Sequence, residues 1–447
     1  MVVFAQQSRD DPSLVEVVDK FHERACSEGS YIDWGALRRF SVAESSTDQT
    51  FATGYHLIVT RADRETLDGE LQALVAKGVT SIKLFTTYAS MMLRDDELLD
   101  CLVAARRQQI SVLLHAENGD IISFLQKQLE ERGMVEPYYH GLARPPIVEA
   151  EATNRGIVLS ELVQHPILFV HVGSALAMDA IRQAQTRGLP IRAETCPQYM
   201  HLSWDDMKRF ADPQHVFHNS KFCCSPPPGP DGSDQEALWT GLANGTFTVY
   251  SSDHCPFSFN DKRGKALGVL LHKESMEGRD PDAPVHEIVK GATGHFAHIP
   301  NGCPGIETRV PILFNYGVEQ GRITPERFVE LTSTAAAKLY GMYPRKGAFV
   351  PGLSDADITI WYPKGKMAPF DLTNDHLHSD CDYTPFDGMH FKNWPRFTIS
   401  RGQVMWQEGE LVGKANSGEY IKRSTSYFPQ RSVAPQDVRR VATWMSQ

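Results

Sequence analysis

The sequence predicts an α/β fold built on a parallel sheet, and three observations lead to this prediction. Apolar segments of strand length alternate with helical patterns from the start of the chain to about residue 256. Several of these segments are continuous Val, Ile and Leu runs, as expected for parallel strands buried on both faces. Seven such segments occur, most of them followed by a helix, and repeated βα units imply a parallel sheet. This count leaves two arrangements open, an eight-stranded barrel that is one strand short and an open doubly wound sheet.

The strands are expected in a regular order along the chain. They are predicted at residues 1–5, 55–60, 80–88, 110–117, 167–174, 190–199 and 247–257. The helix after the second strand illustrates the pattern, because its apolar residues recur at helical spacing and Gly78 ends it as a C-cap residue. No glycine-rich phosphate-binding motif follows any strand, so the sequence gives no support for nucleotide binding.

The pattern changes after a further helix expected through residues 324–341. Short segments punctuated by Gly, Pro and Asp follow, and they predict a small β-rich unit. We therefore divide the chain into a barrel domain (1–343), a β-rich unit (344–412) and an extended C-terminal arm (413–447). Residues 36–54 and 264–294 break the βα rhythm, and we interpret both as insertions.

Composition narrows the class of protein. Of the 447 residues, 41% are hydrophobic and 22% are charged, which is ordinary for a globular protein. The net charge of −10 argues against a nucleic-acid or anionic-membrane partner. No apolar run approaches the length of a membrane span, and the first residues do not form a secretory signal. The eight cysteines form no CxxC pair, which indicates reduced, mostly buried thiols in a cytoplasmic protein.

Four predicted strands place a polar residue at their carboxyl end, where the chemistry of a parallel barrel lies. Lys83 lies within one strand, His115 and His171 end two others, and Asp253 follows a fourth. Histidine and carboxylate are good zinc ligands, whereas a charged lysine is not. A lysine whose pKa is depressed by burial and nearby cations can add carbon dioxide. The resulting carbamate can bridge two metals, which would explain a lysine within an apolar strand.

A plainer interpretation exists for each of these residues. Lys83 could reach the rim of the sheet with its ammonium group, or its strand could be an exposed edge. A single histidine at a strand end is more often structural than a ligand. The four residues together, all at the same end of their strands, are harder to explain by packing.

The chain resembles the cyclic amidohydrolases of the hydantoinase and dihydropyrimidinase type over nearly its whole length. The matching stretches are "GVTSIKLFTTY", "LLHAENGD", "FVHVGS", "AETCPQY", "CCSPP", "SSDHCPF", "IPNGCPGIETRVPILF", "AAAKLYGMYPRKG" and "SDADITIW". The resemblance implies a TIM-type (β/α)8 barrel that holds two zinc ions bridged by a carboxylated lysine. It implies that Lys83 is this lysine. His115 and His171 would bind one metal, while Asp253 would bind the other and move the proton.

The resemblance also implies the substrate and the residues that hold it. Tyr88 would stabilise the oxyanion, and Ser225 and Asn301 would hold the ring, largely through backbone atoms. The reaction would open a dihydropyrimidine or hydantoin to an N-carbamoyl amino acid. The partner would thus be a small cyclic amide, and the assembly a homotetramer.

One feature of that family is absent from this sequence. The family has a His-x-His pair at the end of its first strand, whereas the only match here is His376–His378, in the C-terminal region. The first residues match the family's second strand, so we expect a barrel without its first strand. We hypothesise that the gene model is incomplete or unspliced, and that the chain binds one zinc ion or none. The alternatives are a catalytically impaired or non-catalytic relative, and an allantoinase- or dihydroorotase-type ring opener.

Overall fold

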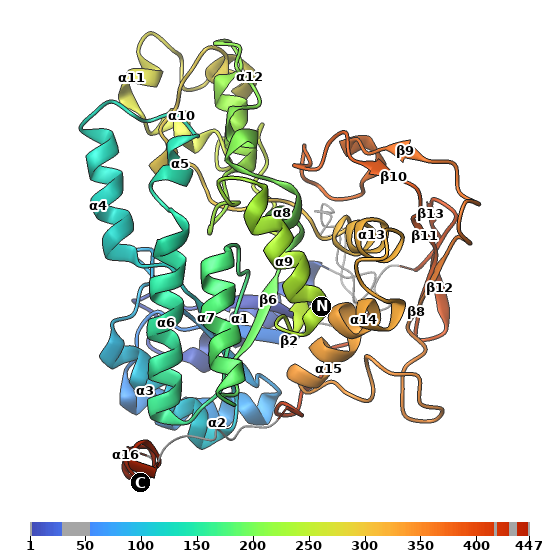
Figure 1. Cartoon of the computed structure of the whole chain (residues 1–447). Coiled ribbons are helices and arrows are strands. Elements are labelled where there is room, and N and C mark those ends of the chain that lie inside the picture. Colours follow the sequence, from blue (N-terminus) through green and yellow to red (C-terminus); the bar gives the residue numbers. More distant parts are fainter. Residues whose placement is uncertain (1, 29–53, 415–417, 429–435, 446–447) are drawn as a thin grey trace.

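The computed structural model describes residues 2–28, 54–414, 418–428 and 436–445 (Figure 1). In these residues seven strands form one parallel sheet whose spatial order follows the chain, from β1 to β7. The strands are β1 (Val2–Gln6), β2 (Gly54–Ile58), β3 (Ser81–Phe85), β4 (Ser111–His115), β5 (Ile167–Phe169), β6 (Arg192–Thr195) and β7 (Val249–Tyr250). All seven expected strands are therefore present. β1 and β2 each extend one residue beyond the predicted bounds, and the other five lie within them.

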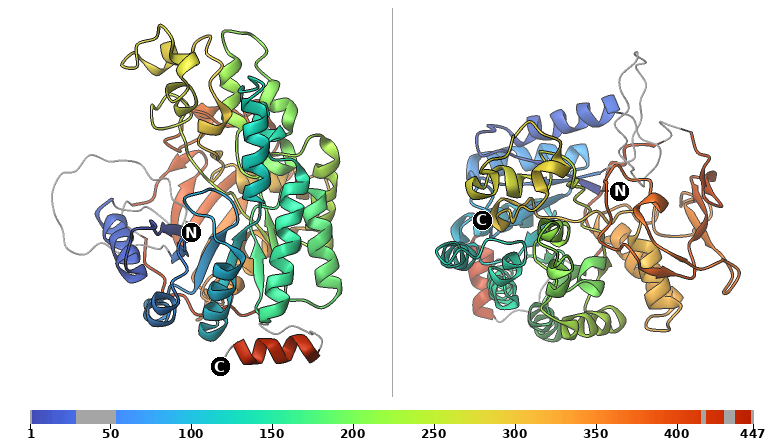
Figure 2. Two further views of the ribbon diagram at one scale, coloured as in Figure 1. Left: turned by 90° about the vertical axis from the view of Figure 1, so that its left-hand side faces the viewer. Right: turned by 90° about the horizontal axis from the view of Figure 1, so that it is seen from above.

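Helices connect the strands, and several of them cover the outer face of the sheet (Figure 2). They are α1 (Leu14–Glu28), α2 (Arg64–Lys77), α3 (Asp95–Gln108), α4 (Gly119–Glu130), α5 (Tyr139–Leu142), α6 (Pro146–Val163), α7 (Ala175–Thr186), α8 (Pro197–His201) and α9 (Gly232–Asn244). The largest buried apolar cluster fills the layer between these helices and the strands. A second, smaller cluster lies on the inner face, where Leu113, Leu168 and Val249 from three strands meet Tyr340. Apolar packing on both faces explains the continuous apolar runs of the central strands.

The sheet curls into a barrel that is open between β1 and β7, its two edge strands in the described residues. This confirms the TIM-type α/β fold with seven rather than eight strands. Residues 36–53 lie outside the described residues, so the expected insertion there has no structural counterpart to report. No helix in the described ranges is long and apolar enough to cross a membrane.

Residues 264–294 carry three short helices, α10 (Leu267–Leu270), α11 (Lys273–Met276) and α12 (Val285–Val289). Their side chains join a separate apolar cluster with Phe217 and Phe296. The segment interpreted as an insertion thus supplies buried side chains, and it contacts the loops that close the upper end of the domain in Figure 1.

The helix expected through residues 324–341 is built from α14 (Pro325–Val329) and α15 (Ala335–Leu339), joined by a π-helical turn, and α13 (Arg309–Leu313) precedes them. The predicted β-rich unit is also confirmed, and it stands beside the barrel in Figure 1. Its strands are β8 (Ile358–Trp361), β9 (Phe370–Asp371), β10 (His390–Phe391), β11 (Pro395–Ser400), β12 (Gln403–Gln407) and β13 (Glu410–Leu411).

The sequence predicts an extended C-terminal arm, and the structure differs from this prediction. The arm ends in a helix, α16 (Gln436–Met445), which packs beside α6. The arm also touches the barrel earlier, where Tyr420 donates a hydrogen bond to the Lys77 carbonyl at 2.9 Å. The polar composition of the arm concealed this helix, because its few apolar residues lie on one face and are sparse.

Candidate active site

Lys83 lies in the middle of β3, an inner strand paired with β2 and β4, and only 5% of its surface is exposed. Both plainer interpretations of this residue are therefore wrong, because it neither reaches the rim nor lies on an edge strand. Its Nζ lies 4.6 Å from the ring centroid of Phe4 and 4.9 Å from that of Phe85. The lysine thus points into the barrel between β1 and the carboxyl end of β3.

His115, the last residue of β4, is held by a buried carboxylate. Its Nε2 lies 2.7 Å from Glu117 Oε2, and the same oxygen accepts a hydrogen bond from Arg144 Nη1 at 2.7 Å. Burial opposes ionisation of Glu117, but Arg144 and His115 outweigh it and lower the pKa of this carboxyl to about 2. Burial lowers the pKa of His115, although Glu117 opposes this shift. The chain of contacts fixes the orientation of the His115 ring.

His171 lies against His115, with ring centroids 4.4 Å apart and the rings edge to face. Both of its ring nitrogens are buried and have no hydrogen-bond partner among the described residues. Burial, with the nearby charges of His115 and Lys83, lowers its pKa well below the usual value. Buried polar atoms in native proteins are normally satisfied, so this pair of nitrogens marks a position that suits a ligand or ion.

Three of the predicted site residues have left-handed backbone conformations. Tyr88 has φ 67°, His171 has φ 43° and Asp253 has φ 41°. Such values are uncommon outside glycine and cost free energy, which the surrounding structure must supply. Strained residues cluster at functional sites, so this observation supports the same location independently of the side-chain chemistry.

Tyr88 joins the strand ends to two loops. Its ring lies 5.7 Å from that of His115, and the Arg144 guanidinium lies 5.3 Å from its centroid. Asn301 Nδ2 donates a hydrogen bond to the Tyr88 hydroxyl oxygen at 3.2 Å. The Ser225 hydroxyl lies beside this phenol without an aligned hydrogen bond to it. Burial raises the pKa of Tyr88, so the phenol keeps its proton at neutral pH.

Asp253 is connected to the lysine side of the site through Glu194 on β6. Burial raises the pKa of Glu194 to about 7, while the charge of Lys83 lowers it and that of Asp253 raises it. Ser251 donates a hydrogen bond to Glu194 Oε1 at 3.0 Å. Glu194 therefore lies in the electrostatic field of both Lys83 and Asp253.

The donor atoms fit a metal ion on the side of β4 and β5. His115 donates its Nε2–H to Glu117, which leaves the lone pair of Nδ1 available, as in the carboxylate–histidine–metal arrangement. The orphaned nitrogens of His171 offer a second donor. Among the described residues, no group of three or more His, Cys, Asp or Glu side chains could hold a metal. A three-ligand site here would therefore need a ligand of another type, and the sequence-based candidate is Lys83, whose charge acts on His171.

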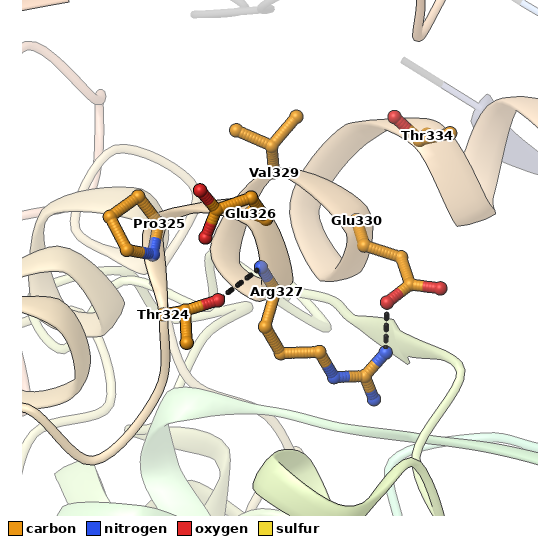
Figure 3. A pocket seen from close by; sticks show the side chains of 7 residues that line it. All are labelled: Thr324, Pro325, Glu326, Arg327, Val329, Glu330 and Thr334. Carbon is orange, nitrogen blue, oxygen red and sulfur yellow. Dashed lines mark hydrogen bonds and ion pairs between the residues drawn. The ribbon is translucent and has the colours of Figure 1, made fainter.

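Two hollows in the described residues are alternative locations for a ligand. One lies behind the histidines and is lined by Glu117, Arg144, Glu149 and Ser174 together with residues 226–229. The other, drawn in Figure 3, lies along α14, where Thr324 caps the helix and Arg327 pairs with Glu330 at 2.6 Å. This second hollow contains none of the strand-end residues, so we assign it no part in the chemistry.

The structure brings six of the predicted residues together and relates Asp253 to them through the electrostatics of Glu194, and four further residues near them were not predicted from the sequence. Lys83, His115, His171 and Tyr88 contact one another or a common neighbour, and Ser225 and Asn301 meet at Tyr88. The missed residues are Glu117, Arg144, Glu194 and Lys265. Glu117 and Glu194 lie inside the stretches that match the cyclic amidohydrolases. Glu117 could have been found from the sequence, because it is a carboxylate two residues after the predicted ligand His115.

Comparisons with known proteins agree with this geometry. The sequence profile of the Amidohydrolase family matches residues 38–405. A D-hydantoinase of Rhizobium radiobacter is 38% identical over 371 residues, which are 83% of this chain and 73% of the relative. A D-hydantoinase of Ralstonia pickettii is 35% identical over 426 residues, 95% of this chain and 80% of the relative.

A solved structure shows the same fold. The crystal structure of dihydropyrimidinase from Brevibacillus agri NCHU1002 superposes with a TM-score of 0.80 at 34% identity, covering 96% of this chain and 81% of that one. The agreement extends over the barrel and the β-rich unit. This chain therefore belongs to the amidohydrolase family and, within it, to the group of cyclic amidohydrolases that contains the hydantoinases and dihydropyrimidinases.

Proposed function

We propose that this chain hydrolyses a cyclic amide and opens a dihydropyrimidine or hydantoin ring to an N-carbamoyl amino acid. The observation that carries the proposal is the group of Lys83, His115, His171 and Tyr88 at one end of the sheet. The relatives named D-hydantoinase and dihydropyrimidinase support the same reaction class.

The metal is part of the proposal, since amidohydrolases are metal-dependent enzymes. Lys83 as its carbamate, His115 and His171 would hold one zinc ion, and Asp253 would face a second position. When bound, the metal supplies Lewis acidity for the activation of water and the polarisation of the ring carbonyl.

The side chains of the chain itself account for the remaining steps. Asp253 takes a proton from the attacking water and returns it to the ring nitrogen as the C–N bond breaks. The Tyr88 oxygen already accepts a hydrogen bond from Asn301, so its own O–H is free to donate to the carbonyl oxygen as negative charge develops there. Main-chain groups near Ser225 and Asn301 hold the ring.

The test is direct hydrolysis of dihydrouracil and of an unsubstituted hydantoin by the zinc-supplemented chain, followed by mass spectrometry of the N-carbamoyl product. We expect product formation that Asp253→Ala abolishes. Product no greater than that of Asp253→Ala would contradict the proposal. Allantoin and dihydroorotate, assayed in parallel, distinguish the other ring-opening activities.

A second function is favoured by one observation. The described residues contain no group of three His, Cys, Asp or Glu side chains that could hold a metal without Lys83, and the sequence has no His-x-His pair among its strand ends. A relative that binds the ring without opening it would lack a complete set of metal ligands in this way. Binding of dihydrouracil by calorimetry without any product would favour this function over hydrolysis.

We also propose that the chain forms a homo-oligomer, with four copies by analogy to the family. Large apolar side chains are exposed on three neighbouring outer helices, at Phe124 on α4, Ile147 and Val158 on α6, and Leu176 on α7. Large exposed apolar side chains are common at subunit interfaces. Light scattering on the eluted protein should give a multiple of the mass of one chain.

A further inference from the structure

Lys265 lies in the loop between β7 and α10, and none of its surface is exposed. Its Nζ donates hydrogen bonds to three main-chain carbonyl oxygens, at 2.8 Å to Cys223, 2.7 Å to Pro300 and 2.8 Å to Gly302. An ammonium group has three N–H donors, and each of them has an acceptor here. Lysine is rarely buried completely, so this arrangement calls for a specific reason.

The three carbonyls belong to the two loops that the proposed function assigns to the substrate. Cys223 lies two residues before Ser225, in the loop that follows residues 216–222. Pro300 and Gly302 flank Asn301 on both sides. These loops are distant in sequence, and the Lys265 ammonium joins them at one point.

Main-chain hydrogen bonds also join the loop around Asn301 to the loop at Cys223 and to the segment after β7. The Gly302 N–H donates to the Cys223 carbonyl at 3.0 Å, so this oxygen accepts from both Gly302 and Lys265. The Cys255 N–H donates to the Cys303 carbonyl at 3.0 Å. Through Asn301, which donates to the Tyr88 hydroxyl, the joined loops also reach the phenol.

We propose that Lys265 is a positioning residue, which fixes the backbone of the loops at 223–225 and 300–302 so that both face the ring in one arrangement. The contribution of Lys265 to catalysis rests on the proposed function, whereas its role in holding the two loops together does not. Replacement of the ammonium by an apolar group would leave the buried carbonyls of Pro300 and Gly302 without this donor and the Cys223 carbonyl with the Gly302 N–H alone, so the two loops would be held together less firmly.

The first readout is amide hydrogen exchange in Lys265→Met, which keeps an unbranched apolar side chain but loses all three donors. We expect exchange in peptides covering 221–226 and 300–304 to become about tenfold faster or more, with β3, β4 and β5 unchanged. Wild-type exchange in these two loops would overturn the proposal.

Arg279→Met is the matched control. Arg279 Nη1 also contacts three main-chain carbonyls within residues 264–294, those of Glu287, Ile288 and Lys290, at 3.4, 3.1 and 2.8 Å. This variant should accelerate exchange around α12 and leave the two loops as they are. Equal acceleration of the loops in both variants would mean that Lys265 only supports the fold of the segment, and the proposal would fail.

Lys265→Arg covers the case in which Lys265→Met does not fold. The planar guanidinium keeps the charge but cannot direct three donors from one atom to three carbonyls. We expect Lys265→Arg to fold. Amide hydrogen exchange in its two loops should be faster than in the wild type but slower than that of an unprotected amide. Loop exchange equal to the wild type would overturn the proposal.

The second readout concerns the substrate. In an active wild type, Lys265→Arg should raise the KM for dihydrouracil about tenfold and lower kcat less, because the displaced loops hold the ring and reach the reacting centre only through the Asn301–Tyr88 hydrogen bond. Faster loop exchange with an unchanged KM would overturn the positioning role. If the wild type neither binds nor opens the ring, the proposed function fails, and the exchange data still decide whether Lys265 joins the loops.

Discussion

The two flanks of Lys83 differ in the chemistry that they offer. On the side of β4 and β5, His115 and His171 present ring nitrogens, and Glu117 orients the first of them at 2.7 Å. On the side of β1, the ring of Phe4 lies 4.6 Å from Nζ, and 37% of its surface is exposed. We refer to these as the histidine flank and the β1 flank.

This difference determines which state of Lys83 each flank favours. An aromatic ring attracts an ammonium cation through its quadrupole but provides no ligand for a metal. The histidine nitrogens can bind a metal, and a metal favours the negatively charged carbamate of the lysine. We therefore propose that the described residues bind a metal on the histidine flank and not on the β1 flank, and substitutions on the two flanks can test this asymmetry.

Lys83→Ala should abolish metal binding, because the histidine flank then keeps only two ligands. Zinc sites normally use three protein ligands or more. Lys83→Arg should have the same effect, since a guanidinium stays charged and cannot form the carbamate. Elemental analysis of the purified variants measures the result.

The control for this prediction is Lys77→Ala, which removes a lysine that pairs with Asp19 at 2.6 Å on the outside of the barrel. Its metal content should equal that of the wild type. Retention of the wild-type metal content by Lys83→Ala would disprove the bridging role of Lys83.

Tyr88→Phe should lower kcat by about 10²–10³, the usual cost of one oxyanion donor. Metal content should stay constant, because the Tyr88 ring only packs beside His115, at 5.7 Å between centroids. Steady-state kinetics and elemental analysis on the same sample separate the two effects. Tyr362→Phe, in the β-rich unit, is the control and should keep the wild-type kcat. A near-normal kcat for Tyr88→Phe would indicate that the Tyr88 ring merely packs.

Glu117→Gln should weaken metal binding about 10- to 100-fold, as is usual when the partner of a ligand histidine is changed. The substitution keeps the shape of the side chain but removes the negative charge that both His115 and Arg144 face. Zinc titration by calorimetry measures the affinity. An unchanged affinity would mean that Glu117 serves only to neutralise Arg144.

Glu149→Gln should make stability less dependent on pH. Glu149 lies on α6 behind the histidine flank and accepts a hydrogen bond from the Gly173 N–H at 2.9 Å, and burial raises the pKa of its carboxyl from 4.5 to about 8. The folded state thus retains a proton that the unfolded state loses above pH 4.5, so wild-type stability falls as the pH rises toward 8.

The glutamine keeps an acceptor for Gly173 and has no charge to bury. The Tm of Glu149→Gln relative to the wild type should therefore rise between about pH 5 and about pH 8.5. Glu151→Gln, on the partly exposed side of the same helix, should show no such trend. A pH-independent difference for Glu149→Gln would show that its carboxyl is already ionised in the folded protein.

The sheet and the strand-end residues could be predicted because their signals are local. Lys83, His115 and His171 each stand out within a short apolar run, and the βα rhythm places them at one end of the sheet. Arg144 and Lys265 could not be found in this way, since the significance of each depends on contacts with distant residues. Lys265 lies in a segment that breaks the rhythm, and only the fold shows that its ammonium reaches the two loops.

The absence of a strand-end His-x-His pair predicts the metal content of this chain. On the side opposite the histidine flank, the ligands that we predict among the described residues are Asp253 and the carbamate of Lys83, which is fewer than zinc sites normally use. The metal position on the histidine flank should fill, and the other should stay weak. Ring opening should be correspondingly slow.

The most direct test of this account is the zinc stoichiometry of the wild-type chain, His171→Ala and Phe4→Leu, measured by native mass spectrometry in the presence of bicarbonate. We predict about one zinc ion per chain for the wild type and for Phe4→Leu, and none for His171→Ala. Two zinc ions in the wild type, or one in His171→Ala, would contradict the claim that Lys83, His115 and His171 form the single metal site.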